Sequence, residues 1–225
     1  MAFYATLNGG RVVSAHVEIP YYGTWTADVT LAADTVLAAE DVLTIGDLSL
    51  KGFVQRVFDF AGSRTCRLVG GYGGWQKTIP AKAYLLPSGV PVSMVLGDAA
   101  QECGEQWGTL DLSSYASGVL ASSWVRERAA AQRVLRLLAG ALWWVDGTGA
   151  TRLAPRASTA IGSAFQAIKY SGGRGRFEIA TETIGDWMPG RTFSSPTVPT
   201  PQTVSLSSVD VTNDGTLRVV VLTTP

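Results

Sequence analysis

The C-terminal end of the chain contains the pattern that most restricts the fold: two runs of alternating apolar and polar residues separated by a short turn. The runs cover residues 204–211 and 217–222, and Asn213-Asp214-Gly215 stands between them. Alternation with a period of two gives a strand one apolar face, and these turn residues tolerate the positive φ of tight hairpins. The pattern predicts a closing β-hairpin. A turn at Met188-Pro189-Gly190 precedes it and leads into another strand.

The first 70 residues repeat this pattern in shorter units. Turn residues such as Asn8-Gly9-Gly10 and Gly46-Asp47 separate the alternating runs, and no helical period interrupts them. The 25 glycines and 10 prolines of the chain supply the turns that many short strands require. A closed or nearly closed β-barrel is therefore predicted. Its strands are expected at residues 3–7, 12–19, 25–31, 42–45, 48–58 and 65–69.

The middle of the chain changes to a helical period. Pro91 suits the first helical position, apolar residues recur on one face from Val92 to Cys103, and Gly104 suits a helix C-cap, which predicts a helix at 91–103. A second helix is expected to begin after Ser122-Ser123. Its apolar stripe and its arginines predict a helix with one packed and one solvated or interface side. The stripe contains Ala131, Val134, Leu135, Leu138 and Leu142, and the arginines are Arg126, Arg128, Arg133 and Arg136.

The last third returns to strands, after a hairpin at residues 143–153 around Asp146-Gly147. Strands are expected at 164–170 and 176–181 with a turn at Gly172-Gly173, followed by the final hairpin. Residues 194–201 contain three prolines, which lack amide donors, so this stretch is predicted to be an extended surface loop.

The chain is thus predicted to be mainly β with a small α/β insert: two small β-barrels flank a helix-containing segment. The first barrel is assigned to residues 1–75 and the insert to 76–155. The second barrel is assigned to 156–225 and includes the proline-rich loop 194–201.

The charge balance argues against several functions. Eighteen basic and eighteen acidic residues cancel, and no block of like charge suggests a nucleic-acid footprint or a trap for acidic substrates. No segment approaches the roughly 20 apolar residues of a membrane-spanning helix. The N-terminal residues lack the features of a signal peptide, so synthesis in a cytoplasmic compartment is expected.

No catalytic, metal or cofactor site is predicted. His16 is the only histidine and is expected on the polar face of a strand, and no Cys-x-x-Cys motif occurs. Glu102 and Glu105 form the best carboxylate pair, but these residues and Asp98 are predicted to be a solvated helix end. No GxSxG nucleophile motif occurs. We therefore do not expect an enzyme.

Three further features have simple structural interpretations. Cys66 and Cys103 are expected to be free buried thiols, although a disulfide between them remains open. The glycine-rich stretch 70–75 could suggest a phosphate-binding loop, but Pro80 disfavours the helix that such a loop must enter. Close backbone packing around Trp75 is the preferred interpretation.

Several short motifs, taken in order, resemble the baseplate and tail hub proteins of tailed bacteriophages. This family is similar to the hubs of contractile tails and of type VI secretion spikes. The resemblance covers nearly the whole chain, although each motif is short. The matching stretches are residues 67–75 with 79–84, 92–105, 123–138, 143–147, 187–190 and 215–218.

The resemblance implies a structural virion protein at the tail tip. Hubs of this type are trimers in which two barrels per subunit make a pseudo-sixfold ring between a hexameric tube and a trimeric spike or fibre. The implied partners are other copies of the chain, the tail tube and neighbouring baseplate proteins, with the genome passing through the channel without specific binding. Compared with this family, the 225 residues are few and are expected to include no lysozyme or spike domain, and the proline-rich stretch 194–201 resembles an insertion.

A carbohydrate-binding β-domain is the alternative function. It would use some of the seven tryptophans as stacking platforms for sugars. Aromatic side chains in β-rich folds are more often part of a core or of a protein interface, which favours the structural role.

Overall fold

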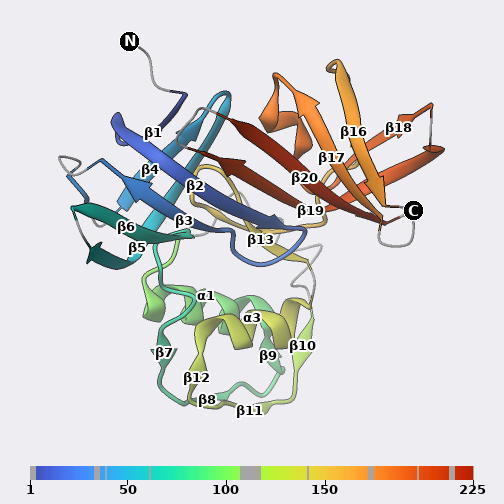
Figure 1. Cartoon of the computed structure of the whole chain (residues 1–225). Coiled ribbons are helices and arrows are strands. Elements are labelled where there is room, and N and C mark those ends of the chain that lie inside the picture. The colour runs from blue at the N-terminus through green and yellow to red at the C-terminus, as the bar shows by residue number, and fades with distance from the viewer. Residues whose placement is uncertain are drawn as a thin grey trace.

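The computed structural model describes residues 4–32, 36–38, 40–60, 62–106, 118–140, 142–171, 175–196, 198–212 and 216–224. Its first part is a closed barrel of six antiparallel strands in the order β1-β4-β5-β6-β3-β2 (Figure 1). Pairing of β1 with β2 closes the circle. The predicted barrel is therefore confirmed. The strands are β1 Ala5–Leu7, β2 Gly10–Pro20, β3 Thr26–Leu31, β4 Glu40–Ile45, β5 Leu48–Phe60 and β6 Ser63–Gly70.

The turn between β1 and β2 forms as its sequence predicts. Asn8 and Gly9 have φ angles of 49° and 81°, which are the positive values that a two-residue hairpin of this hand needs. The Asn8 side chain also accepts a hydrogen bond from the Val42 amide, at 2.9 Å. This turn is therefore attached to β4 as well as to its own strands.

Trp25 occupies one end of the barrel interior and needs two glycines to do so. Gly52 on β5 pairs directly with Gly70 on β6, and the Trp25 indole lies against both. A Cβ atom on either glycine would stand 2.5 Å from a ring atom of Trp25. The absence of side chains at this pair thus creates the space for the indole.

The insert contains one long interrupted hairpin, with helix α1 between its innermost strands and helix α3 directly after its last strand. Three outgoing strands pair with three returning strands in nested order: β9 with β10, β8 with β11, and β7 with β12. Figure 1 shows helices α1 and α3 between this ladder and the barrel. The elements are β7 Thr78–Ile79, β8 Lys82–Leu85, β9 Val90–Pro91, α1 Val92–Cys103, β10 Val119–Leu120, β11 Ser123–Arg126, β12 Ala129–Ala130 and α3 Ala131–Ala139; the hairpin β13 Trp143–Val145 and β14 Thr151–Leu153 follows.

Both predicted helices form, but the second begins later than predicted. Gly104 is the C-cap of α1 with φ 79°, as expected, whereas Pro91 is its N-cap and not its first helical residue. The stretch from Ser123 to Arg126 is strand β11, and α3 begins only at Ala131. The prediction of a helix from Ser122-Ser123 was wrong because β11 pairs with β8, a long-range contact that overrides a local capping signal.

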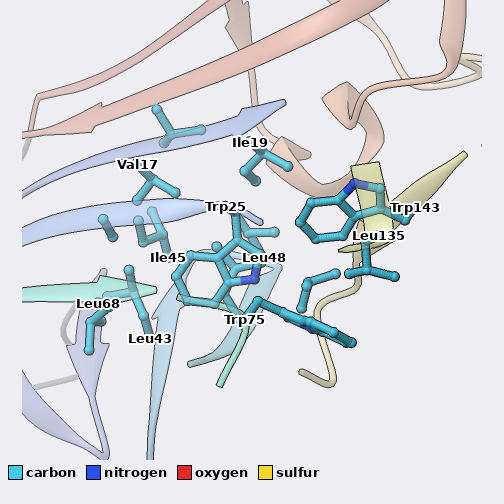
Figure 2. Packing of buried hydrophobic residues seen from close by; sticks show 14 of the residues in the cluster. Val17, Ile19, Trp25, Leu43, Ile45, Leu48, Leu68, Trp75, Leu135 and Trp143 are labelled. Carbon is cyan, nitrogen blue, oxygen red and sulfur yellow. The ribbon is translucent and has the colours of Figure 1, made fainter. Parts of the chain in front are cut away.

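A continuous apolar core joins the barrel to the insert. Figure 2 shows Trp75 and Trp143 between the barrel residues around Trp25 and Leu135 of α3. The rings of Trp75 and Trp143 have centroids 6.2 Å apart and tilt at 54°. The Trp75 indole N–H donates to Thr151 Oγ1 at 2.8 Å, so its one polar atom is satisfied.

The last third is a rolled sheet that continues the barrel sheet. Its strands follow β2 in the order β19-β20-β17-β16, and β18 pairs with β19 and β15. β16 is not hydrogen-bonded to β15 or β18 in the described pairings. The elements are β15 Thr159–Ala160, β16 Phe165–Ser171, β17 Arg176–Thr181, the 3-10 helix η2 Ile184–Trp187, β18 Arg191–Ser195, β19 Val198–Val211 and β20 Leu217–Thr224.

Aromatic side chains hold this roll together where hydrogen bonds do not. Phe165 on β16 packs against Phe193 on β18, with ring centroids 5.7 Å apart. Trp187 contacts both rings, at 4.9 and 5.1 Å, and Phe177 of β17 lies 5.0 Å from Phe193. Side-chain packing therefore brings the two edges of the roll together.

The proline-rich stretch is not a surface loop, which corrects the prediction for residues 194–201. β18 and β19 form a hairpin there, with Ser195 paired to Val198. β20 joins β19 only from Thr203 onward. Because this part of β19 has a partner on one side only, Pro201 can lie in a strand without breaking a ladder.

The final hairpin forms with one irregularity. A β-bulge between Val204 and Leu206 shifts the register, so Ser207 is buried and Leu206 only half-buried. The Met188-Pro189-Gly190 turn is confirmed: Arg191 N–H donates to the Met188 carbonyl at 3.2 Å, and β18 follows. The turn residues Asn213-Asp214-Gly215 and Gly172-Gly173 lie outside the described residues.

The mainly β architecture with a helix-containing insert is confirmed. Its buried side chains form one cluster that extends through the barrel, the insert and the last third. The boundaries at residues 75 and 155 stay a prediction, because one sheet and one core cross the whole chain. Within the described part of the chain, no helix has the length and apolar character to cross a membrane.

Candidate assembly surface

The junction between β2 and β19 makes one wall out of the two halves. Six residue pairs connect these strands, from Leu206 opposite Pro20 to Val211 opposite Ala15. Val17 and Val209 are directly opposite each other and fully buried. Through this antiparallel ladder the sheet runs from the barrel into the rolled last third without a break.

A row of charged side chains crosses the outer face of this joined sheet. In the strand register, Arg67, Asp28, His16, Asp210 and Arg218 are successive neighbours on β6, β3, β2, β19 and β20. Arg67 pairs with Asp28 at 3.3 Å, and Arg218 pairs with Glu178 at 2.8 Å. Opposite charges on neighbouring strands favour this register. We call these residues, with Glu178, the charged row.

His16 stands at the centre of the charged row, on the junction itself. Its Nδ1 lies 2.5 Å from Asp210 Oδ1, and its Nε2 lies 3.6 Å from Glu18. The hydrogen bond to Asp210 raises the pKa of His16, and burial opposes that rise. The predicted place on a polar strand face is confirmed, and the structure adds an acidic partner from the other half of the chain.

Two polar anchors fix the last third to the barrel. The Asp47 carboxylate accepts hydrogen bonds from the amides of Ile184, at 2.8 Å, and Gly185, at 3.1 Å. The Arg156 guanidinium donates to the carbonyls of Pro20 and Tyr21 and lies 4.1 Å above the Trp144 ring. Burial lowers the pKa of Arg156 to about 10. A cleft of about 510 Å³ separates these anchors.

The opposite end of the joined sheet is β16, which pairs with β17 and with no other strand in the described part of the chain. Phe165 packs its ring on β18, and the exposed stretch 168–171 is left as an open edge. A β-bulge lies between Ala167 and Lys169. The side chain of Ile168 is 62 % exposed and that of Tyr170 43 %. An exposed strand edge with apolar side chains is suited to pairing with another chain.

Glu105 is not part of a solvated helix end, which corrects the prediction. It is only 7 % exposed, and its carboxylate accepts hydrogen bonds from the amides of Tyr72, Gly74 and Trp75. The Gly74 contact is 2.5 Å long. Burial raises the pKa of Glu105, and these three N–H groups oppose that rise. The glycine-rich stretch thus cradles an anion, but the anion is a side chain of the protein itself.

Glu102 and Asp98 belong to an ion-pair network rather than to a reactive site. Glu102 pairs with Arg126, whose side chain is 1 % exposed, and Lys82 pairs with Asp98 at 2.5 Å. Arg126 also donates to the Pro80 carbonyl at 3.1 Å. The prediction that Arg126 is solvated was wrong, because β11 turns it inward toward α1.

The remaining predicted residues have structural positions. Cys66 and Cys103 are free and buried, as expected, and burial raises the pKa of both thiols to about 11. Four tryptophans are buried, two are half-buried and one lies outside the described residues. Within that described part, no group of His, Cys, Asp or Glu could hold a metal ion. The buried tryptophans are Trp25, Trp75, Trp143 and Trp187, and the half-buried ones are Trp124 and Trp144.

The sequence interpretation missed Asp47, Arg126 and Arg156. Each is charged and interacts with a partner distant in the sequence. Asp47 accepts a hydrogen bond from the Ile184 amide, Arg126 forms an ion pair with Glu102, and Arg156 donates a hydrogen bond to the Pro20 carbonyl. One local signal existed, since Asp47 follows Gly46 in a hairpin turn where a short acidic side chain is common. Its distant partner had no signal in the sequence.

Comparison with known proteins finds solved structures with a similar fold but no match by sequence. No protein-family model matches the chain, and no curated protein matches it. Among solved structures, the Escherichia coli protein c3393 superposes with a TM-score of 0.65 at 10% identity, covering 98% of this chain and 76% of the other. It is described as a type VI secretion component with structural similarity to the T4 tail proteins gp27 and gp5.

Two tail proteins superpose over similar lengths. The 43 kDa tail protein of prophage MuSo2 from Shewanella oneidensis gives a TM-score of 0.62 at 9% identity, and a tail protein of Neisseria meningitidis gives 0.59 at 9% identity. Each comparison covers 98% of this chain and 96% of the other. The chain has the tail-protein fold.

The tail-protein fold gives the joined sheet a context. Because only 9–10% of the residues are identical, the similarity concerns the backbone fold, and the roles of individual residues cannot be transferred to this chain. It confirms the family resemblance at the level of the fold. The tail-protein fold covers the barrel, insert and rolled last third together, because almost the whole chain superposes.

Proposed function

We propose that the chain is a non-catalytic structural component of a phage tail or of a related injection device, located in the hub at the tail tip. The observation that carries this proposal is the joined sheet: a closed barrel and a rolled sheet form one wall through the β2–β19 ladder. The tail-protein fold supports the same conclusion.

In the proposed assembly, three copies form a ring with two wall segments from each copy. The two segments are comparable in size and lie side by side in Figure 1, so three copies would present six similar units to a hexameric tube. The open edge at β16 supplies a surface for the contact between copies. Closed assemblies of this kind cover strand edges that a monomer would expose.

The non-catalytic part of the proposal rests on how the charged side chains are used. Glu105 binds backbone amides, Glu102 binds Arg126, and His16 binds Asp210 across the junction. Each of these groups has a structural partner. The carbohydrate-binding alternative is less favoured, because four of the seven tryptophans are buried in the core.

Electron microscopy of the purified chain, alone and mixed with the tail tube protein of the same particle, tests the proposal. Class averages should show rings with six similar densities. Ile168→Asp should keep the fold and lose the rings, because a charge then stands at the β16 edge. Leu85→Asp, a matched exposed apolar position on the insert, should keep them. Particles that remain single copies with the tube protein present would refute the ring.

A further inference from the structure

A groove on the insert has the properties of a second binding surface. It lies between strand β11 and helix α3 and has a volume of about 510 Å³. Figure 1 shows both elements in the insert, away from β16 to β20. Its lining combines apolar side chains, among them Val125 and Leu137, with Arg126, Arg133, Arg136 and one carboxylate, Glu127.

Helix α3 supplies one wall with an exposed apolar residue beside two arginines. Arg133, Arg136 and Leu137 are three and four residues apart and so share one face. Leu137 is 72 % exposed, and Val125 on the opposite wall is 57 % exposed. Leu137 is exposed although α3 already buries Ala131, Val134, Leu135 and Ala139 in the core, so it is not needed for the packing of the helix.

The charges of this groove are not balanced within the described part of the chain. Arg133 and Arg136 form no ion pair there, and Glu127 is the one carboxylate in the lining. Arg126 also lines the groove, is 1 % exposed and uses its two Nη groups on Glu102, Pro80 and Tyr84. Its buried Nε has no hydrogen-bond partner among the described residues. A buried donor of this kind normally has a partner.

Strand β11 offers backbone groups beside these side chains. It is hydrogen-bonded to β8 on one side and to no described strand on the other. An extended peptide can add to such an edge, with its backbone giving affinity and its alternate side chains giving specificity. The groove thus combines a strand edge, exposed apolar side chains and unpaired cations.

We propose that this groove binds an extended segment of another protein that carries alternating acidic and apolar side chains. Its carboxylates pair with Arg133 and Arg136, and its apolar side chains cover Leu137 and Val125. Nucleic acid is the less favoured occupant, because exposed leucine and valine do not match a phosphate backbone. The proposal concerns a surface on the insert and does not depend on ring formation at β16.

Fluorescence anisotropy with a short labelled peptide of alternating glutamate and leucine tests the proposal on the full chain. The peptide should bind, and its affinity should fall with added salt as charge pairing requires. A lysine–leucine peptide and a glutamate–serine peptide should bind at least about tenfold more weakly, a difference of about 1.4 kcal/mol.

Surface variants distinguish binding in the groove from nonspecific electrostatic attraction. Arg133→Gln with Arg136→Gln, or Leu137→Ser, should weaken binding about tenfold while the melting temperature stays unchanged. The control Arg56→Gln with Val57→Ser removes an arginine and an exposed apolar residue on β5 and should bind as the unmodified chain does. Absent binding, equal binding by the lysine–leucine peptide or by all variants, or stronger binding of a single-stranded oligonucleotide that depends on Arg133 and Arg136 would overturn the proposal.

Discussion

Gly52 and Gly70 show how single residues decide whether the barrel holds together. They form one cross-strand pair, and the Trp25 indole takes the space that two Cβ atoms would fill. Neither contact can relax easily, because Trp25 is enclosed by the barrel. The two glycines thus leave the space in which the Trp25 indole packs.

Gly70→Ala should therefore lower the free energy of unfolding by about 2–3 kcal/mol, the usual cost of overpacking a rigid core. The measurement is urea unfolding followed by tryptophan fluorescence. Gly97→Ala is the control: this helical glycine has no atom within 4 Å of the added Cβ, so a gain of about 0.5–1 kcal/mol is expected. Equal effects of the two substitutions would contradict the proposed packing of Trp25 in this space.

The Glu105 carboxylate attaches the loop that follows the barrel, residues 71–75, to the end of helix α1. Glu105→Ala leaves three amides, those of Tyr72, Gly74 and Trp75, without their acceptor, and should cost about 3 kcal/mol or more. Glu105→Gln keeps one acceptor oxygen and should cost less. Thermal unfolding measures both, with the exposed Glu182→Ala expected to change stability by under about 0.5 kcal/mol. A Glu105→Ala protein as stable as that control would show that the loop does not need the carboxylate.

The stability of the junction should depend on pH through His16. Asp210 raises the pKa of His16 in the folded state. The His16–Asp210 pair therefore stabilises the fold fully at pH values below the unfolded pKa of about 6.5, and this stabilisation is lost as the pH rises through the folded pKa. The side chain is half exposed, so the effect stays below about 1 kcal/mol. The stability difference between the unmodified chain and His16→Gln should shrink between pH 5.5 and 8.5. A difference that grows with pH would reverse the assigned sign.

The sequence predicted the position of His16 and the free thiols but not the use of Glu105. The glycine-rich stretch 70–75 was interpreted as close backbone packing around Trp75. The backbone does approach other groups closely, but these are the rings of Trp25 and Phe53 and the Glu105 carboxylate, so the predicted neighbour was wrong. Glu105 follows a helix end some thirty residues later, and a single sequence contains no signal for such a distant contact. A periodic pattern reports local surroundings, whereas Glu105, Asp47 and Arg126 owe their roles to distant partners.

At the scale of elements, alternation predicted the strands well, and competing signals misled elsewhere. All six barrel strands follow from runs of alternating residues. β11 was mistaken for a helix because Ser122-Ser123 resembles a cap, yet its partner β8 lies about forty residues earlier. The prolines of residues 194–201 were assigned to a loop, although a strand with one free side accepts them.

The closing hairpin β19–β20 is the element that joins the halves. Truncation after Phe193 should leave insoluble protein, because β2 then loses β19 and keeps only its partners within the barrel, and the buried residues that packed against the hairpin lose their cover. The finer variant Val209→Asp places a charge opposite Val17 and should prevent folding, whereas Asp210→Asn at the next position should fold. Soluble expression with a normal melting transition is the measurement. A soluble, folded truncation would make the hairpin an appendage.

At the scale of the molecule, the sequence predicted a barrel, an insert and a second strand-rich part in the right order. It did not predict that one sheet runs through both ends or that aromatic packing brings together the edges of the second roll. The continuous sheet depends on β2 meeting β19 across nearly the whole chain. The order of strands along a chain does not determine which edges meet in space.

Native mass spectrometry of the chain with its tail tube protein tests the central claim most directly. The account predicts a species whose mass contains three copies of the 23.8 kDa chain, because two wall segments from each copy then complete a ring of six. A mass that contains a single copy at every tube-protein concentration would contradict it.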